Sequence, residues 1–205
     1  SFGQAAARYG LPTPRGILVL GPPGVGKSLL AKATASSLHM ALLRLDIGKV
    51  QASLVGQSEE RMRRALGMAE VQAPCVLWID ELEKAFAGAR GASGDSGVTQ
   101  RIFGTFLTWL QERTKPVFIF ATANDISALP PEFLRKGRFD EIFFVDLPTP
   151  KERKAILKVL LGKYGRKSKR LVTDSLAKRL DRYAGAEIES VIVEAMYEAF
   201  YDGQR

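Results

Sequence analysis

Residues Gly21–Ser28 read GPPGVGKS, and this stretch decides the fold class. It fits the pattern G-x-x-x-x-G-K-[ST], in which glycines allow backbone N–H groups to curl around phosphate oxygens. The apolar run Gly16–Gly21 before it predicts a buried strand, and the spacing over Ser28–Leu38 predicts a helix. A helix that starts at such a loop offers its N-terminus to the same anion. The sequence therefore predicts a phosphate-binding loop between a strand and a helix.

Two side chains at the end of this loop have specific predicted roles. Lys27 supplies a positive charge that reaches the outer phosphates, and the Ser28 hydroxyl can bind Mg²⁺. The predicted nucleotide-binding residues of the loop are Gly21, Pro22, Pro23, Gly24, Val25, Gly26, Lys27, Ser28 and Leu29.

Apolar runs and amphipathic stretches alternate along the next 120 residues. Strands are expected at Ala41–Ile47, Cys75–Glu81, Pro116–Asp125 and Glu141–Pro148, and helices at Ser58–Ala73, with Ser58 as N-cap, and Gln100–Arg113. A loop rich in Gly and Ser is expected at Ala87–Gly97. Apolar strands that alternate with helices predict an α/β fold with a parallel sheet covered on both faces.

The pattern changes after residue 147. Three amphipathic helical stretches follow Pro148, with no strand between them. We therefore expect a large α/β domain over residues 1–147 and a small all-helical domain over residues 148–205.

Polar residues end two of the predicted strands. Asp80 would hold Mg²⁺ through water, and Glu81 would polarise the attacking water. Asn124, at the end of the next strand, would hold that water against the γ-phosphate. The alternative for Asn124 is that it caps the following turn. Adjacent acids after an apolar strand are weak evidence alone, but together with the phosphate-binding loop they are strong evidence for phosphoryl transfer.

Two arginines, Arg135 and Arg138, occur in the stretch LRKGRFDEIFF, residues 134–144. An arginine that stabilises the transition state of phosphoryl transfer can act within its own chain or on a neighbouring one. The alternative is that both arginines pair with the local acids Asp140 and Glu141. The sequence pattern alone does not separate these interpretations.

Composition excludes several classes of function. His39 is the only histidine, which excludes a site built from several histidines, and the lone Cys75 is expected to be a small core residue. The chain shows no secretory leader and no run of 18 apolar residues, so no membrane partner is expected. The formal net charge of +8 can attract nucleic acid, but the basic runs at 163–170 and 178–182 contain few aromatic residues for base stacking.

The ordered set GPPGVGKS, VLWIDE, ATAND and ALPPEFLRKGRFDEIFFVDLPTPKER resembles the AAA ATPases. Its details are most similar to the AAA proteins of a conserved open reading frame in chloroplast and cyanobacterial genomes and to their bacterial relatives. The resemblance implies ATP and Mg²⁺ as cofactors, a helical lid after the α/β domain, and a ring of six copies of the chain.

The same resemblance implies roles for individual residues. Asn124 matches the first sensor, and Arg135 and Arg138 match paired arginine fingers that act on the nucleotide of a neighbouring copy. Gly185 and Ala186 match a segment near adenine, and Gly10 lies where the adenine pocket begins. The stretch SLVGQSEE, residues 53–60, aligns with the central pore loop but departs from the family, because Leu54 stands where the aromatic residue usually lies, followed by Val55 and Gly56.

Three functions follow from the resemblance. The favoured one is Mg²⁺-dependent ATP hydrolysis by a ring that remodels an unidentified protein, in the cytoplasm or the chloroplast stroma. The second is an ATP-controlled switch that binds nucleic acid through the basic helical domain. The third is a regulatory or scaffolding ATPase whose nucleotide state is the signal.

Overall fold

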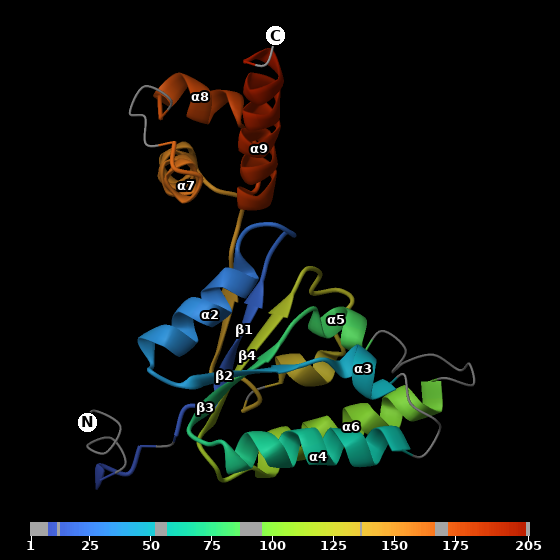
Figure 1. Cartoon of the computed structure of the whole chain (residues 1–205). Helices are drawn as coiled ribbons and strands as arrows, with labels where there is room; N and C mark the ends of the chain where they lie inside the picture. The colour runs from blue at the N-terminus through green and yellow to red at the C-terminus, as the bar shows by residue number, and fades with distance from the viewer. Residues whose placement is uncertain are drawn as a thin grey trace. The chain divides into compact units, whose positions relative to one another are not determined.

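A computed structural model describes residues 8–11, 13–51, 57–86, 96–135, 137–166 and 172–203 of the chain. Five strands form one sheet in the order β2-β3-β4-β1-β5, and all neighbours are parallel (Figure 1). The strands are β1 (Gly16–Leu20), β2 (Ala41–Leu45), β3 (Cys75–Ile79), β4 (Val117–Ala123) and β5 (Glu141–Phe144). The predicted α/β fold with a parallel sheet is confirmed.

Burial differs between the centre of the sheet and its edge. Every residue of β3 is buried, as expected for a strand that pairs on both sides. Strand β5 pairs only with β1, and its Ile142, Phe143 and Phe144 are 43%, 50% and 68% exposed. The expected cover on both faces therefore does not extend over β5, because this strand lies at the edge.

Helices flank the sheet, with α2 on one side and the packed pair α4 and α6 on the other (Figure 1). The long helices are α2 (Lys27–Ser37), α4 (Gln57–Val71) and α6 (Ser96–Glu112); the short ones are α3 (Ile47–Gln51), α5 (Leu82–Ala85) and the 3-10 turn η2 (Pro131–Leu134). None of the three short elements was expected from the sequence, because they span too few residues to show a helical period.

Two predicted helix starts are wrong. Ser58 is not an N-cap, because α4 already begins at Gln57 and Ser58 is buried inside its first turn. Helix α6 begins at Ser96, four residues before the expected Gln100. Most of the predicted loop at Ala87–Gly97, namely residues 87–95, lies outside the described residues.

Aromatic rings dominate the core at the junction of α5, α6 and η2. Phe86, Phe106 and Phe133 are each at most 1% exposed, with ring centroids 5.5–6.0 Å apart. Such contacts add about 0.5–1.5 kcal/mol per pair to the burial of the rings. They attach α5, which carries part of the candidate site, to the body of the α/β unit.

Cys75 is a core residue, as expected. It is fully buried at the start of β3, and its Sγ donates to the carbonyl oxygen of Ala69 at 3.3 Å. Burial raises the pKa of the Cys75 thiol, because the thiolate would lose its hydration there.

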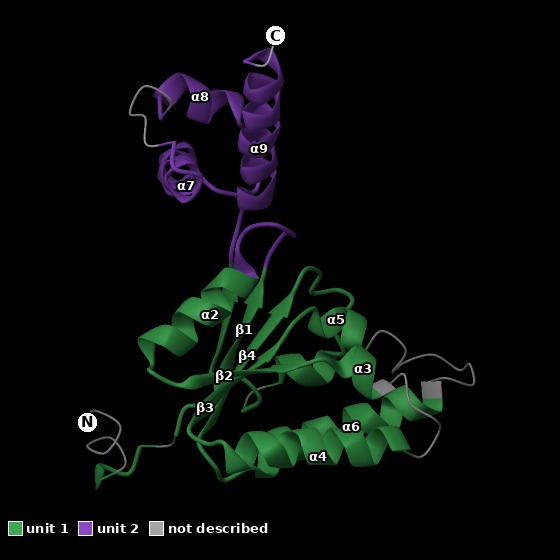
Figure 2. Ribbon diagram, viewed as in Figure 1, with its two compact units in different colours: residues 1–20, 28–144 green, residues 21–27, 145–205 purple. Residues whose placement is uncertain are grey.

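Contacts divide the chain into two compact units (Figure 2). One contains residues 1–20 and 28–144, and the other contains residues 21–27 and 145–205. The loop 21–27 belongs with the helical unit because it contacts the start of α9 (Gly185–Asp202), where the backbone N–H of Ala186 donates to Gly24 O at 3.1 Å. The expected division after residue 147 stays a prediction, and the grouping of this loop was not foreseen.

The helical unit has a core of its own, formed where α7 (Pro150–Lys163), α8 (Asp174–Arg179) and α9 pack together. Helix α7 starts with a capping box, in which Thr149 Oγ1 accepts from Glu152 N and Glu152 Oε2 accepts from Thr149 N at 2.8 Å. Three helices were expected after Pro148, and three are found among the described residues of this part. The buried core residues are Leu157, Leu161, Leu180, Ile188 and Ile192.

One buried arginine ties these helices together. Arg153 is 4% exposed, and its guanidinium donates to Ala177 O at 2.7 Å, Pro148 O at 2.7 Å and Asp181 Oδ1 at 3.1 Å. These bonds join α7 to α8, to the residue after the C-cap of α8, and to the segment before α7. The apolar part of the side chain packs while the fork of donors satisfies buried carbonyl groups.

We expect Arg153→Met to lower the free energy of unfolding by about 2–4 kcal/mol, because it leaves buried acceptors without their donor. Urea denaturation followed by circular dichroism measures the loss. Arg179→Met is the matched control, since Arg179 is exposed on α8 and should change stability little. Equal unfolding midpoints for the two variants would contradict the assignment.

Candidate functional site

The predicted phosphate-binding loop connects β1 to α2 and contains left-handed backbone. Gly24 has a φ of 80° and Gly26 a φ of 99°, a region that favours glycine. A Cβ on Gly24 would also lie 3.2 Å from the Cβ atoms of Ala184 and Ala186. The shape of the loop and its contact with small residues of α9 therefore both depend on this glycine.

Lys27 lies inside the curve of the loop. The residue is 8% exposed, and its Nζ donates to Gly21 O at 2.6 Å and to Pro22 O at 2.7 Å. Both of these partners are neutral carbonyl groups, so the bonds position the ammonium without cancelling its charge. Such a buried positive charge, at the first residue of a helix, is suited to bind a phosphate.

The residues expected near adenine divide into two groups. Gly185 and Ala186 adjoin the loop, because Ala186 N donates to Gly24 O and a Cβ on Gly185 would lie 3.4 Å from that oxygen. Gly10, with a φ of 82°, lies in a segment before β1 whose Tyr9 is 85% exposed. The adenine roles of all three residues stay predictions.

A second group of polar residues lies where β3 and β4 end, and we call Asp80, Glu81, Glu83, Thr122 and Asn124 the carboxylate edge. Parallel strands end at the same edge of a sheet, which is where ligands bind in open α/β folds. The Thr122 hydroxyl donates to Asp80 Oδ1 at 2.6 Å and accepts from the backbone N–H of Glu81 at 3.1 Å. One buried threonine thus sets the positions of both predicted acids.

Glu81 has an unusual backbone conformation. Its φ of 50° and ψ of 56° are left-handed, which is uncommon for a residue other than glycine and marks functional sites. Its Oε1 accepts from Lys84 Nζ at 2.6 Å and from Asn124 Nδ2 at 3.4 Å. The structure therefore brings the predicted water-activating residue and the predicted sensor together.

The hydrogen bonds around the end of β4 bear on the two interpretations of Asn124. The turn that follows β4 is capped by Asp125, whose Oδ1 accepts from the backbone N–H and the hydroxyl of Ser127 at 2.8 and 2.7 Å. Asn124 instead donates to Glu83, from its backbone N at 3.1 Å and from its Nδ2 at 3.0 Å. These contacts favour the sensor interpretation of Asn124, and its role stays a prediction.

Several residues of this edge were not predicted. Thr122, Glu83 and Lys84 contact the predicted residues as described above, and Arg44 Nη2 lies 3.7 Å from Asp80 Oδ2. The one available signal for Arg44 was a charged residue inside an apolar strand. The hydrogen bond to Glu81 raises the pKa of Lys84, which keeps this amine charged.

Asp80 and Glu81 line a cleft of about 220 Å³. Arg44, Asp46 and Lys84 line it too. Within the described ranges, no group of three or more His, Cys, Asp or Glu residues is arranged to hold a metal ion. Mg²⁺ is commonly bound by one or two protein oxygens together with phosphates and water. The Asp80 carboxylate and the Ser28 hydroxyl supply oxygen atoms of the kind that such an ion prefers, and their role as its ligands stays a prediction.

The two predicted arginine fingers differ in exposure. Arg135 is exposed directly after η2, whereas Arg138 is 8% exposed and donates from Nη1 to Leu107 O at 2.9 Å. Burial, with a smaller effect from Arg135, lowers the pKa of Arg138. Of the pair, Arg135 is therefore the exposed residue.

The local acids do not hold these arginines in the part of the chain that the structure describes. Asp140 Oδ2 accepts from the backbone N–H groups of Arg15 and Gly16 at 2.5 and 2.8 Å. Asp140 thus anchors the start of β1, and the alternative in which it pairs with Arg135 and Arg138 is not found.

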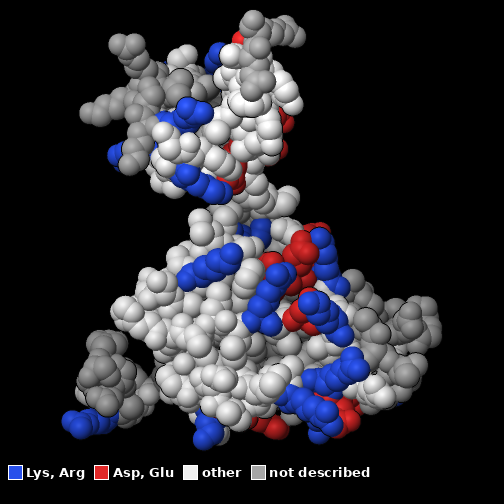
Figure 3. Space-filling model, viewed as in Figure 1, with Lys and Arg blue, Asp and Glu red and all other residues white. Residues whose placement is uncertain are grey.

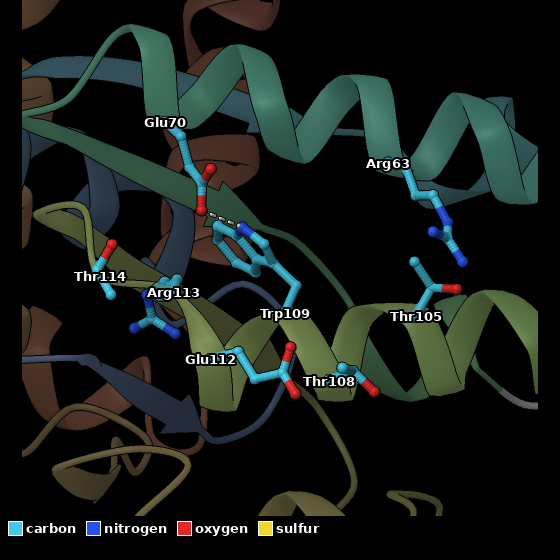
Figure 4. Close-up of a pocket in the computed structure, with 8 residues that line it drawn as sticks. All are labelled: Arg63, Glu70, Thr105, Thr108, Trp109, Glu112, Arg113 and Thr114. Atoms are coloured by element: carbon cyan, nitrogen blue, oxygen red, sulfur yellow. Dashed lines mark hydrogen bonds between the residues drawn. The ribbon is translucent and has the colours of Figure 1, made fainter.

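A larger hollow of about 510 Å³ lies between α4 and α6, away from the predicted site (Figure 4). In it, Trp109 Nε1 donates to Glu70 Oε1 at 2.8 Å. Arg113 donates to the carbonyl groups of Leu110, Val117 and Arg15, and burial lowers its pKa to about 10. These bonds join α6 to β4 and β1, so Arg113 acts as a structural link.

The nucleic-acid alternative concerns the basic helical domain and stays a prediction. On the face shown in Figure 3, Lys and Arg side chains of the α/β unit are interspersed with Asp and Glu. Part of the predicted basic run, residues 167–170, and the predicted pore-loop residues Leu54, Val55 and Gly56 lie outside the described residues. Where helices are described, none is both long and apolar enough to cross a membrane.

Comparison with known proteins agrees with this geometry. Residues 17–147 match the model of the ATPase family associated with various cellular activities, abbreviated AAA. The whole chain is 50% identical to 40% of an uncharacterized AAA domain-containing protein, ycf46, of Guillardia theta. Over 89% of the chain it is 37% identical to a quarter of the cell division cycle protein 48 homolog of Archaeoglobus fulgidus.

A third relative is the ATP-dependent zinc metalloprotease FtsH of Mycoplasmopsis pulmonis, 37% identical over 95% of the chain and 26% of that protein. The chain thus spans about two fifths of the ycf46 proteins and less of the other relatives. The resemblance to the AAA proteins of a conserved chloroplast reading frame, noted in the sequence, is confirmed.

Proposed function

Because the chain belongs to the AAA family of ATPases, we propose that it binds ATP with Gly21–Leu29 and hydrolyses it with the carboxylate edge. The observation that carries the proposal is the contact of Glu81 with Asn124, 3.4 Å from Oε1 to Nδ2, at the ends of two parallel strands. A carboxylate and an amide on one water molecule are the groups that an in-line attack on phosphorus needs.

Each residue has one role in this proposal. Lys27 neutralises charge on the outer phosphates. The Ser28 hydroxyl and the Asp80 carboxylate would hold Mg²⁺, which would supply positive charge to the phosphate oxygens. Thr122 keeps one oxygen of Asp80 fixed through its 2.6 Å hydrogen bond. Glu81 accepts the proton of the attacking water, and Asn124 orients that water molecule. Gly185 and Ala186 adjoin the adenine of the nucleotide.

Assembly and client are the finer parts of the proposal. We propose a homo-hexameric ring in which Arg135 reaches the nucleotide of a neighbouring copy, since this residue is exposed directly after η2. A protein client is favoured because one relative is named as an ATP-dependent metalloprotease, an enzyme that acts on polypeptides. The cytoplasmic or stromal location stays a prediction.

Replacement of Lys27 tests whether the phosphate-binding loop binds ATP. Lys27→Ala should weaken ATP binding about 10- to 100-fold, because a charge-assisted contact contributes about 1.5–3 kcal/mol. Titration with a fluorescent ATP analogue measures the affinity, and phosphate release measures turnover. Lys32→Ala, on the exposed face of the same helix, is the matched control and should bind like the parent. Equal affinities for the two variants would reject the site.

Assembly has its own measurement. Light scattering with and without ATP should find a hexamer, and phosphate release per chain should rise with protein concentration, since each site is completed by a second copy. A monomer with full turnover would reject the ring.

A further inference from the structure

Glu83 is a buried carboxylate that the proposed mechanism does not use. It is 6% exposed and lies in the single turn of α5. We infer that Glu83 is a positioning residue, which holds the Asn124 side chain in the orientation needed to align the attacking water. This inference rests on the proposed ATP hydrolysis, and its experiment includes a measurement that does not.

Glu83 accepts hydrogen bonds from the backbone and from the side chain of one residue, Asn124. Its Oε1 accepts from the backbone N of Asn124 at 3.1 Å and from Nδ2 of Asn124 at 3.0 Å. An asparagine amide has a donor at one end and an acceptor at the other, and a free amide can present either. With Nδ2 held by Glu83, rotation of the amide by 180° would break this bond, so the direction of Oδ1 is determined.

The position of α5 connects Glu83 to Glu81. Glu81 is the residue before the helix, and its left-handed backbone turns the chain so that Glu83, two residues later, faces the end of β4. Lys84, the next residue, bonds Glu81 Oε1 at 2.6 Å. The same turn of helix thus sets the positions of the proposed base and of the proposed sensor.

Burial of this carboxylate is costly for the fold. Its Oε2 atom is buried and accepts no hydrogen bond within the described part of the protein. A buried polar atom without a partner destabilises a fold, and hydrophobic packing alone gains nothing from a carboxylate at such a position. A packing role for α5 would therefore be met better by methionine, which leaves the contact with Asn124 as the reason for a carboxylate.

The chain offers a direct probe of this contact, because Asn124 is its only asparagine. Labelling with ¹⁵N-asparagine yields one backbone amide signal and one side-chain amide pair in the full chain. In the parent, we expect two separated side-chain signals and slow hydrogen exchange. In Glu83→Met, the exchange of the Asn124 amides should be about tenfold faster, as expected for loss of roughly 1.4 kcal/mol of hydrogen bonding.

Turnover gives the second readout. Glu83→Met should lower kcat up to about a hundredfold without changing the affinity for ATP, since small misplacement of a positioning group has effects of that size. Glu83→Gln retains an acceptor oxygen and should keep most of the turnover. Combined with Asn124→Ala, Glu83→Met should add no further loss, because it acts through Asn124.

Glu60→Gln is the control, since Glu60 is exposed on α4 and pairs only with Arg64 among its described ionic contacts.

Unchanged Asn124 signals in Glu83→Met would overturn the inference, whether or not the protein hydrolyses ATP. Changed signals with parental kcat would also overturn it. A kcat that falls only in proportion to a lower Tm would assign Glu83 a structural role. A parent that binds and hydrolyses no ATP, with Asn124 signals that depend on Glu83, would reject the proposed function alone.

Discussion

The variant Glu81→Gln is expected to bind ATP like the parent and to hydrolyse it about 100- to 10,000-fold more slowly, the usual contribution of a general base. Glutamine has the same length and can adopt the same backbone, with φ near 50°, at the same energetic cost. It can still accept from Lys84 or Asn124 through its amide oxygen, but it cannot take a proton from water. The loss should therefore fall on kcat alone.

Phosphate release and binding of a fluorescent ATP analogue measure the two quantities on one preparation. Glu132→Gln serves as a control, because Glu132 is a nearby acid in η2, outside the carboxylate edge. Turnover of Glu81→Gln at the rate of the parent would show that another group activates the water. Weakened binding in this variant would instead place Glu81 in ground-state recognition of the nucleotide.

Arg135→Ala should lower turnover about a thousandfold or more with little change in ATP affinity, as for arginine fingers supplied by a second protein. Arg135 and Arg138 differ in burial, so we expect different effects when each is replaced. Arg135 is exposed, whereas Arg138 donates to Leu107 O from a buried position, so Arg138→Ala should mainly lower the stability of the fold. Thermal unfolding distinguishes the two effects, and Arg101→Ala on exposed α6 surface is the control.

Mixing tests whether Arg135 acts on a neighbouring copy. Arg135→Ala keeps its own loop, and Lys27→Ala keeps its own arginine, so a mixed ring would contain some complete sites. We expect turnover to reappear in the mixture, measured by phosphate release after co-refolding or subunit exchange. Mixtures that assemble and stay inactive would contradict the arrangement, and full activity of Arg135→Ala alone would remove the role of this residue.

The long elements of the fold were predictable because their signals are local. Apolar runs marked β1, β3 and β4, and the glycine pattern marked the loop before α2. Helix α5 was not predicted, because it has four residues directly after an apolar strand and shows no period. The sequence predicted that strand β5 is covered on both faces, because its Ile-Phe-Phe sequence resembles that of a buried strand. In the structure this strand lies exposed at the edge of the sheet.

In the candidate site, too, only residues with a local sequence signal could be predicted. Asp80, Glu81 and Asn124 were predictable because they follow strands that end on one edge. The role of Glu83 was not predictable, because its contact with Asn124 depends on the left-handed backbone of Glu81. No residue pattern in the sequence predicts that conformation. Thr122 was hidden inside an apolar strand, where a threonine commonly serves only as a β-branched residue.

The buried thiol of Cys75 has a practical consequence for studies of assembly. Fully buried and with a raised pKa, it should resist maleimide reagents, which require an accessible thiolate. A cysteine introduced on the surface would then be the sole labelling position without removal of the natural one. Donor and acceptor dyes attached there would report the approach of one copy to another by energy transfer.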